Sequence, residues 1–305
     1  MKNKKYWFLG IGVVGVVLFL LIMMNFQSQK EGSKKENDLF AQLLLNIQEG
    51  NKNEVKRLLE RNSNIINEEK DDLTLLDYSL SYQQFDISTY LIEKGAKTSN
   101  IKEEPILVRI AQHLLDSAHE TKGSVESKRK MLETALDKYG KEINRTDQQK
   151  NTALHIAAIK GDPYYTELLL QKGINTEAKN REGKTAFHLA VELGKIEVVK
   201  QLLARNPKLI EMTDQLGDNS LLIAVKNGRH EIINLFIQRK PELINSFNND
   251  NRTALSIASE YGDAESVKIL LQHNADKNIK SKEGKTALDY AKKWNHEDII
   301  ELLQK

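Results

Sequence analysis

The sequence predicts an all-α solenoid of stacked helix-turn-helix units, preceded by one transmembrane helix. Two observations lead to this prediction. A stretch of 21 residues near the N-terminus, 6–26, contains no charged side chain. From residue 37 onward a pattern of about 33 residues recurs, and each copy holds two apolar stripes with helical spacing.

Charge and composition exclude several classes of function. The chain of 305 residues has a net charge of +2, and residues 1–36 hold six Lys and two Glu, which leaves −2 for the remainder. A nearly neutral body does not favour nucleic-acid binding. The chain contains no cysteine, so disulfides, thiolate nucleophiles and zinc–thiolate sites are excluded.

The uncharged stretch reads YWFLGIGVVGVVLFLLIMMNF. As a helix it would measure about 31 Å, enough to cross the hydrocarbon core of a bilayer. Tyr6 and Trp7 stand where interfacial aromatic side chains are expected. A cleaved signal peptide is the alternative, but its apolar run is shorter and ends at a small-x-small site, whereas this one ends in Met-Met-Asn-Phe-Gln. We therefore expect an uncleaved signal anchor.

The lysines that flank this segment bear on its orientation. Three precede it and three follow it, at Lys2, Lys4, Lys5, Lys30, Lys34 and Lys35. The first three lie closer to the segment, which favours a cytoplasmic tail of residues 1–5 and an extracytoplasmic body. Residues 27–36 read as a polar linker. Heavy use of Lys, Asn and Ile is typical of AT-rich bacterial genes, so we expect a single-pass protein of a bacterial cell membrane.

The segment also matches the dinucleotide fingerprint G-x-G-x-x-G, at Gly10, Gly12 and Gly15. That fingerprint needs a preceding strand and a following acidic residue. Too few residues precede Gly10 to build a strand of a sheet. We interpret these glycines as small residues of a membrane helix.

The repeat is clearest from residue 147 to the end. The copies of its core are TALHIAA from Thr152, TAFHLAV from Thr185, NSLLIAV from Asn219, TALSIAS from Thr253 and TALDYAK from Thr286, at spacings of 33, 34, 34 and 33 residues. In four of the five copies a glycine follows nine residues later, and then a second apolar stripe such as IEVVKQLLARN. The pattern predicts a helix, a tight turn, a second helix and a polar loop.

These residues resemble the ankyrin repeat, with its T-P-L-H-x-A signature, a β-turn and two antiparallel helices. The proline position holds Ala or Ser in this chain. Two degraded copies precede, over 39–67 and 74–97, and an irregular one lies at 101–145, interpreted as an elongated helix pair or an inserted loop. We expect an ankyrin-repeat domain over 37–305 with about eight repeats.

His155 and His188 occupy the same position one period apart. Each stands three residues after a predicted N-cap threonine, where a side chain can bond back to the cap. Other copies hold Asp77, Asp289, Ser256 or Leu222 there. A position that accepts such different side chains indicates capping and not acid–base chemistry.

Other chemical motifs are incomplete. Gly183-Lys184-Thr185 and Gly284-Lys285-Thr286 lack the first glycine of a P-loop, and the sequence after His230 lacks the second histidine of a zinc H-E-x-x-H motif. His113, Asp116 and His119 could meet on helical turns only as pairs. We expect no catalytic residue, no cofactor and no metal.

A stack of such units buries its apolar faces only against neighbours. We expect Leu154, Ala157, Ala158, Leu168 and Leu169, with their counterparts, to form the core. Small residues should let the helices approach closely, at Ala157, Ala190, Ala224, Ala258 and Ala291. The stack should expose a concave face of loop tips and first helices, which suits a protein partner better than a small substrate.

The resemblance implies that partners bind at the loop tips and the exposed ends of the first helices. The positions concerned are Gln148, Gln149, Asn151, Lys160, Arg181, Glu182, Lys184, Glu192, Leu193, Gln215, Leu216, Asp218, Lys226, Asp250, Arg252, Glu260, Tyr261, Lys282, Glu283, Lys285, Lys293 and Trp294. Leu193, Leu216, Tyr261 and Trp294 are apolar where exposure is expected, so they are candidate anchors.

The resulting hypothesis is a non-enzymatic, membrane-tethered scaffold that binds a protein partner. An inhibitor or immunity-type binder of a toxin or enzyme near the membrane is a narrower alternative. An enzyme with its site in the irregular segment 101–145 is the alternative from another class.

Overall fold

The structure is a computed structural model that describes residues 39–99, 104–114 and 122–305. Backbone contacts divide the chain into two compact units, residues 1–43 and 44–305. Of the first unit only 39–43 are described, as the beginning of helix α2 (Leu39–Gln48). The predicted tail, membrane segment 6–26 and linker lie outside the described residues. Among the helices of the described part, none has both the length and the apolar character that a bilayer crossing requires.

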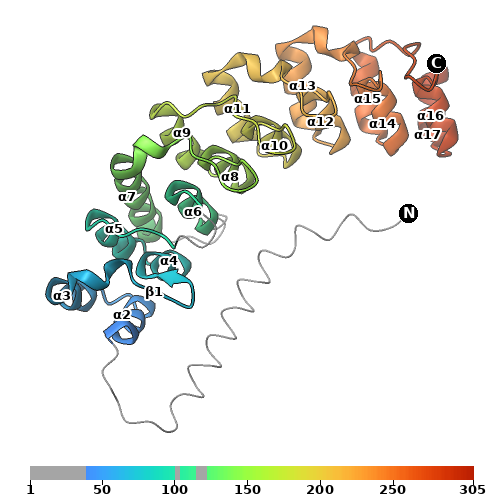
Figure 1. Cartoon of the computed structure of the whole chain (residues 1–305). Helices are drawn as coiled ribbons and strands as arrows, with labels where there is room; N and C mark the ends of the chain where they lie inside the picture. Colours follow the sequence, from blue (N-terminus) through green and yellow to red (C-terminus); the bar gives the residue numbers. More distant parts are fainter. Residues whose placement is uncertain (1–38, 100–103, 115–121) are drawn as a thin grey trace. The chain divides into compact units, whose positions relative to one another are not determined.

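The described part of the second unit is mostly helical, as predicted (Figure 1). After α2 its helices are α3 (Lys52–Arg61), α4 (Leu75–Ser81), α5 (Phe85–Glu93), α6 (Ile106–His113), α7 (Lys122–Tyr139), α8 (Ala153–Lys160), α9 (Pro163–Gln171), α10 (Ala186–Glu192), α11 (Ile196–Arg205), α12 (Ser220–Lys226), α13 (His230–Arg239), α14 (Ala254–Tyr261), α15 (Ala264–Gln272), α16 (Ala287–Lys293) and α17 (Glu297–Gln304). The 3₁₀ turns are η1 (Ser63–Asn67), η3 (Gly140–Glu142), η4 (Pro207–Glu211) and η5 (Pro241–Asn245). Strands β1 (Glu69–Lys70) and β2 (Leu73–Thr74) form an antiparallel hairpin, with Glu69 opposite Thr74.

Consecutive helix pairs pack against each other in chain order. The first helices of neighbouring pairs touch, α8 with α10, α10 with α12, α12 with α14 and α14 with α16. The second helices do the same, α9 with α11, α13 with α15 and α15 with α17. Figure 1 shows this progression from α8 to α17. Each helix pair therefore buries its apolar stripes on its neighbours, which confirms the predicted stacking.

The buried residues are mostly those expected. Leu154, Ala157, Ala158 and Leu169 are completely buried. Leu168 is only half-buried, and the next residue but one, Leu170, packs inside instead. The alanine column was predicted correctly, because Ala157, Ala190, Ala224, Ala258 and Ala291 all have no exposed surface.

The difference between 33-residue and 34-residue spacings has a structural cause. Where the spacing is 34, the second helix is α11 or α13 with ten residues, and Pro207 or Pro241 then begins a 3₁₀ turn. Where it is 33, α9 or α15 has nine residues, and the chain turns through a positive φ at Gly173 or Asn274. Proline presets φ for the first turn of a helix, so the extra residue is accommodated in ordered structure.

The irregular segment 101–145 replaces an ordinary pair in the stack. Helix α6 packs against α4 and α8, and α7 packs against α5 and α9. Helix α7 has 18 residues, about twice the length of the other second helices. Of the two interpretations of this segment, the elongated helix pair applies to its second helix, α7.

The capping function predicted for the two histidines is confirmed. The Nδ1 atom of His188 accepts the Thr185 backbone N–H at 3.1 Å, and the Thr185 hydroxyl accepts the His188 backbone N–H at 3.4 Å. His155 Nδ1 accepts the Thr152 N–H at 3.1 Å. The other ring nitrogen reaches the next repeat, with Nε2 of His155 at 3.2 Å from the Lys184 carbonyl and Nε2 of His188 at 2.8 Å from that of Met212. Because Nδ1 accepts, the neutral ring carries its proton on Nε2 and donates it to that carbonyl.

Asp77 occupies the same position with a carboxylate. It accepts the Thr74 N–H at 3.0 Å and, from the following segment, the Ser99 N–H at 2.7 Å. Arg109 of α6 approaches it at 3.0 Å and also pairs with Glu104 at 3.2 Å. The Asp77 side chain is fully buried and that of Arg109 is 13% exposed, so this ion pair joins two repeats inside the stack.

Replacing Arg109 by methionine should destabilise the protein by about 3 kcal/mol, because a buried carboxylate loses its counter-charge. Urea unfolding followed by circular dichroism measures this. The control is R145M, which removes the exposed ion pair between Arg145 and Glu142 and should change stability little. Equal effects of the two substitutions would contradict the role given to Arg109.

Stability should fall as the pH drops below about 6.5, the ordinary histidine pKa. Burial lowers the pKa of His155 and His188, and the bonds to the Lys184 and Met212 carbonyls oppose this only in part. As the pH decreases, the histidines of the unfolded chain therefore bind protons before those of the folded chain. Proton binding stabilises the unfolded chain, and the free energy of unfolding decreases.

The double variant H155S/H188S tests this, because serine fills the same position as Ser256. We expect it to be less stable at pH 7.5 and to lose less stability than the parent between pH 7.5 and pH 5. His113 is present in both proteins. Desolvation and the charge of Arg109 lower its pKa to about 4. Parallel curves of stability against pH would show that the two rings do not titrate as described.

Candidate protein-interaction surface

The loops before the first helices have rigid tips because one side chain folds each loop. Asn180 accepts the backbone N–H groups of Glu182 and Lys184 with its Oδ1, both at 3.0 Å. The same two bonds, to residues two and four further on, are made by Asp147, Asp214 and Asn248. Such side chains stabilise a turn without any partner from the rest of the molecule.

Backbone hydrogen bonds join each tip to the next. The N–H of Arg181 donates to Gln149 at 2.9 Å, and the series continues from Gln215 to Glu182, from Asn249 to Leu216 and from Lys282 to Asp250, at 3.4, 3.1 and 2.9 Å. Gly183 and Gly217 have φ of +71° and +76°, and a Cβ at either would lie under 3.0 Å from the backbone nitrogen of the next tip. Only glycine permits this spacing. We call the row of tips together with the exposed sides of α8, α10, α12, α14 and α16 the first-helix face.

Ion pairs along the first helices neutralise most of this face. In three repeats the residue before the N-cap of the first helix pairs with a residue eight positions later, near the end of that helix. The pairs are Lys184 with Glu192 at 2.7 Å, Asp218 with Lys226, and Arg252 with Glu260. Burial acts against the charge of Lys184, but the bonds to Glu192 and Glu182 outweigh it and raise its pKa. In the last repeat the corresponding residues, Lys285 and Lys293, are both cations.

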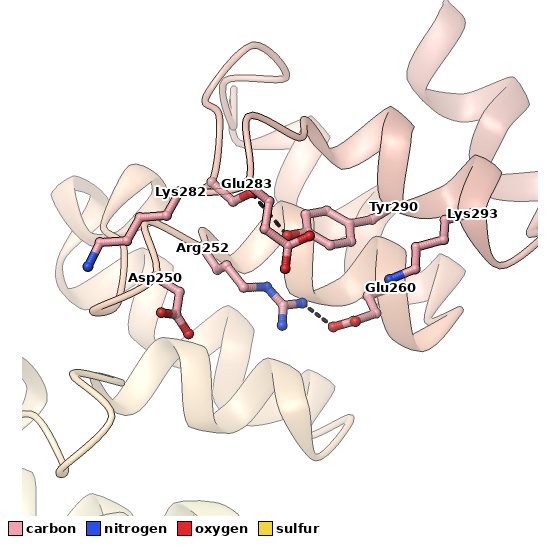
Figure 2. A pocket seen from close by; sticks show the side chains of 8 residues that line it. Asp250, Arg252, Glu260, Lys282, Glu283, Tyr290 and Lys293 are labelled. Carbon is pink, nitrogen blue, oxygen red and sulfur yellow. Dashed lines mark hydrogen bonds and ion pairs between the residues drawn. The ribbon is translucent and has the colours of Figure 1, made fainter. Parts of the chain in front are cut away.

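A cavity of about 190 Å³ lies between the last two repeats. Six predicted surface residues line it, namely Asp250, Arg252, Glu260, Lys282, Glu283 and Lys293, together with Ser281 and Tyr290. Figure 2 shows Arg252 in the middle of this group, beside Glu260 and facing Tyr290, with Lys282 and Lys293 on opposite sides. The guanidinium carbon lies 4.9 Å from the centre of the Tyr290 ring, and the Tyr290 hydroxyl donates to Ser281 Oγ at 3.0 Å.

A second cavity of about 340 Å³ lies between α10 and α12 on the same face. Its predicted residues are Glu182, Lys184, Glu192, Gln215, Leu216, Asp218 and Lys226, and Asp214, Ile223 and Asn227 complete it. In the second cavity Lys184 pairs with Glu192 and Lys226 with Asp218, and in the first Arg252 pairs with Glu260. Neither cavity includes a residue of the irregular segment 101–145.

The structure separates the predicted surface residues by exposure. Those that are exposed are Gln148, Gln149, Arg181, Glu182, Gln215, Leu216, Asp250, Tyr261, Lys282, Glu283, Lys293 and Trp294. Those that are half-buried are Asn151, Lys160, Lys184, Glu192, Leu193, Lys226, Arg252, Glu260 and Lys285. One placement was wrong. Asp218 is 1% exposed, because its carboxylate binds Lys226 and accepts Asn248 Nδ2 at 2.7 Å, so it holds two loops together.

Three of the four apolar candidates are well exposed. Leu216 is 61%, Tyr261 60% and Trp294 53% exposed, whereas Leu193 is half-buried. Sequence reasoning did not identify Tyr290 or Phe247. Tyr290 stands in a position that is Ile or Leu in the four preceding copies, and this change of residue type was a usable signal. Phe247, 57% exposed, lies at the base of a loop, where the repeat pattern gives no signal.

The motifs that resembled catalytic or metal-binding sequences make structural contacts. Within them, no three His, Asp or Glu side chains are grouped so that they could hold a metal ion. Thr185 and Thr286, at the ends of the two P-loop-like sequences, cap α10 and α16. His230 Nε2 lies 2.9 Å from Asp263, and this contact joins two neighbouring second-helix starts.

Comparison with known protein families matches residues 123–214 and 221–305 to the family described as "Ankyrin repeats (3 copies)". These ranges cover more than half of the chain and contain every predicted surface residue except Gln215, Leu216 and Asp218.

Curated relatives share the repeats over short regions. Rabankyrin-5 of Homo sapiens is 30% identical over 192 residues, which is 58% of this chain and 15% of that protein. Inversin of Gallus gallus is 46% identical over 55 residues, 18% of this chain and 5% of inversin. The Transient receptor potential cation channel subfamily A member 1 homolog of Caenorhabditis elegans is 38% identical over 68 residues, 22% of this chain and 6% of that protein.

The chain thus spans a small part of the length of these relatives, and what they share with it is the repeat itself. The helix pairs stacked in chain order, the capping boxes and the extended family match agree with one another. The chain belongs to the ankyrin-repeat family.

Proposed function

We propose that this chain is a non-enzymatic binding protein whose first-helix face holds a protein partner, and that residues 6–26 tether it to a membrane. Ankyrin repeats imply a role in protein–protein interaction, and the partner and the tether are the additional steps of the proposal.

The observation that carries the binding proposal is the combination of rigid loop tips with exposed apolar side chains. Leu216, Tyr261 and Trp294 are each more than half exposed on a face whose backbone is fixed by hydrogen bonds between tips. An interface that forms on a preorganised surface loses little conformational entropy. Large apolar side chains surrounded by polar groups are typical of binding hot spots.

The tether rests on the sequence alone. Residues 6–26 carry no charge over 21 positions, and lysines flank both ends. A helix of that length spans the hydrocarbon core of a bilayer. With the nearer lysines on the cytoplasmic side, the repeats would lie outside the cell membrane.

Changing Leu216 and Tyr261 to aspartate should abolish partner binding and leave the fold intact, because both side chains are exposed. A photo-crosslinking residue at Gln149 in the full chain, used in the cells that make it, would capture and identify the partner. Binding of the purified partner would then be measured for L216D/Y261D, with circular dichroism and melting temperature as checks of folding.

The control for this experiment is L45D, since Leu45 is 50% exposed on α2, outside the proposed surface. We expect L45D to bind like the parent and L216D/Y261D to bind at least 100-fold more weakly, the loss of about 3 kcal/mol typical of two hot-spot side chains. Unchanged binding by L216D/Y261D would show that the partner lies elsewhere.

Removal of residues 6–26 should release the protein from membranes. The full chain should stay with the membrane fraction after an alkaline carbonate wash, and the shortened chain should appear in the supernatant. Protease added to intact cells should digest the repeats of the full chain. A full chain that the carbonate wash extracts would contradict the tether, and repeats protected from protease would contradict the orientation.

A further inference from the structure

The last repeat departs from the charge pattern of the three repeats before it. In those repeats the residue before the N-cap and the residue eight positions later have opposite charges and pair. In the last repeat both are lysines, and Lys285 pairs with Glu283 at 2.7 Å instead. Lys293 makes no ion pair with any described residue, and neither does the exposed Lys282 at the loop tip. The neutralisation of the first-helix face therefore ends at the cavity between the last two repeats.

The electrostatic environment of this cavity favours an anionic carboxylate. The bond to Lys285 lowers the pKa of Glu283, and the charges of Lys293 and Arg252 lower it further. A carboxylate brought by a partner would meet Lys293, which has no ion pair among the described residues, whereas Lys285 and Arg252 already pair with Glu283 and Glu260. Ammonium–carboxylate hydrogen bonds are among the stronger polar contacts that an interface can make.

Exposed aromatic side chains lie next to these lysines. Tyr261 ends α14 and Trp294 follows α16, so both stand at the same end of neighbouring first helices. The Lys293 ammonium lies 5.5 Å from the centre of the Trp294 ring. The Tyr290 ring faces the cavity itself, with Arg252 over it. This region therefore combines cations that lack an ion pair with exposed aromatic side chains, whereas both lysines of the cavity between α10 and α12 are paired with acids.

Resting on the function proposed above, we propose that the last two repeats form a subsite for an acidic segment of the partner. Its carboxylates bind Lys282 at the loop tip and Lys293 at the helix end, and a neighbouring aromatic or aliphatic side chain packs on Tyr261 and Trp294. The segment crosses the cavity shown in Figure 2.

A peptide fits this subsite better than an anionic membrane surface does. Asp250 and Glu260 line the same cavity as the lysines. A continuous anionic surface would bring charge against these two acids and against Glu283, and all three repel it. A peptide can place single carboxylates at the two lysines and avoid the acids. Charge complementarity of this local kind gives specificity as well as affinity.

The test uses the full chain in neutral detergent and two fluorescent ten-residue peptides. The first contains glutamate, aspartate and phenylalanine, and the second has glutamine and asparagine in place of the acids. Fluorescence anisotropy should show that the acidic peptide binds at least tenfold more tightly and that its affinity falls with added salt. Equal binding of the two peptides would overturn the proposal.

The variant K282E/K293E should weaken binding of the acidic peptide at least tenfold. The control K200E/K268E makes the same change of net charge at exposed lysines of α11 and α15 and should have little effect. The variant W294A should weaken binding of the acidic peptide and have little effect on a version with alanine in place of phenylalanine. If K282E/K293E and the control behave alike, the lysines do not form the subsite.

Short-chain phosphatidylserine distinguishes a lipid surface from a peptide. Displacement of the acidic peptide by dihexanoyl phosphatidylserine, where dihexanoyl phosphatidylcholine has no effect, would assign the subsite to lipid headgroups and overturn the proposal. The subsite and the general function can fail separately. A partner that requires Leu216 and Tyr261 but binds K282E/K293E normally would remove the acidic subsite and leave the binding function standing.

Discussion

The contact on which this structure most depends is made by the side chain three residues after each N-cap. In three repeats this side chain accepts hydrogen bonds from its own N-cap and also bonds to the loop or helix that follows. His155 and His188 do so with two ring nitrogens, and Asp77 with two carboxylate oxygens. One buried polar group thus satisfies backbone N–H groups at the start of a helix and also holds the next repeat at a fixed distance. Because such groups are costly to bury without partners, each requires the next repeat to be in place.

The Asn219 repeat, in which Leu222 stands at this position, uses another bond for the same purpose. In the Asn219 repeat the cap itself reaches forward, donating from Nδ2 to Ser246 Oγ at 2.7 Å. In the last repeat Asp289 forms the same capping box with Thr286, but its side chain is exposed. A side chain therefore caps each first helix from α8 to α16, whereas the bond to the following repeat is present in only some of them.

The first-helix face follows from this regularity. Fixed distances between repeats let the loop tips bond to each other, and the bonded tips present their side chains at a regular spacing. Ion pairs within the repeats neutralise most of the charged side chains of the face. The side chains that differ from one repeat to the next therefore decide what the face can bind. Leu216, Tyr261 and Trp294 are such differences, and so is the unpaired Lys293. In this architecture the repeated residues make the surface rigid, and the residues that differ from the repeat pattern determine what it binds.

The sequence by itself determined the helices, their caps, the alanine column and the face on which exposed side chains would lie, because a period of 33 residues constrains local structure and burial together. Tertiary structure decided which of those side chains are free. Asp218 looked like an exposed loop residue, but Lys226 and Asn248 bind it from another turn and another repeat. Leu193 and Tyr261 occupy the same position, but only Tyr261 is well exposed. Burial and pairing depend on side chains that meet only after neighbouring repeats have packed, and no pattern within one repeat contains that information.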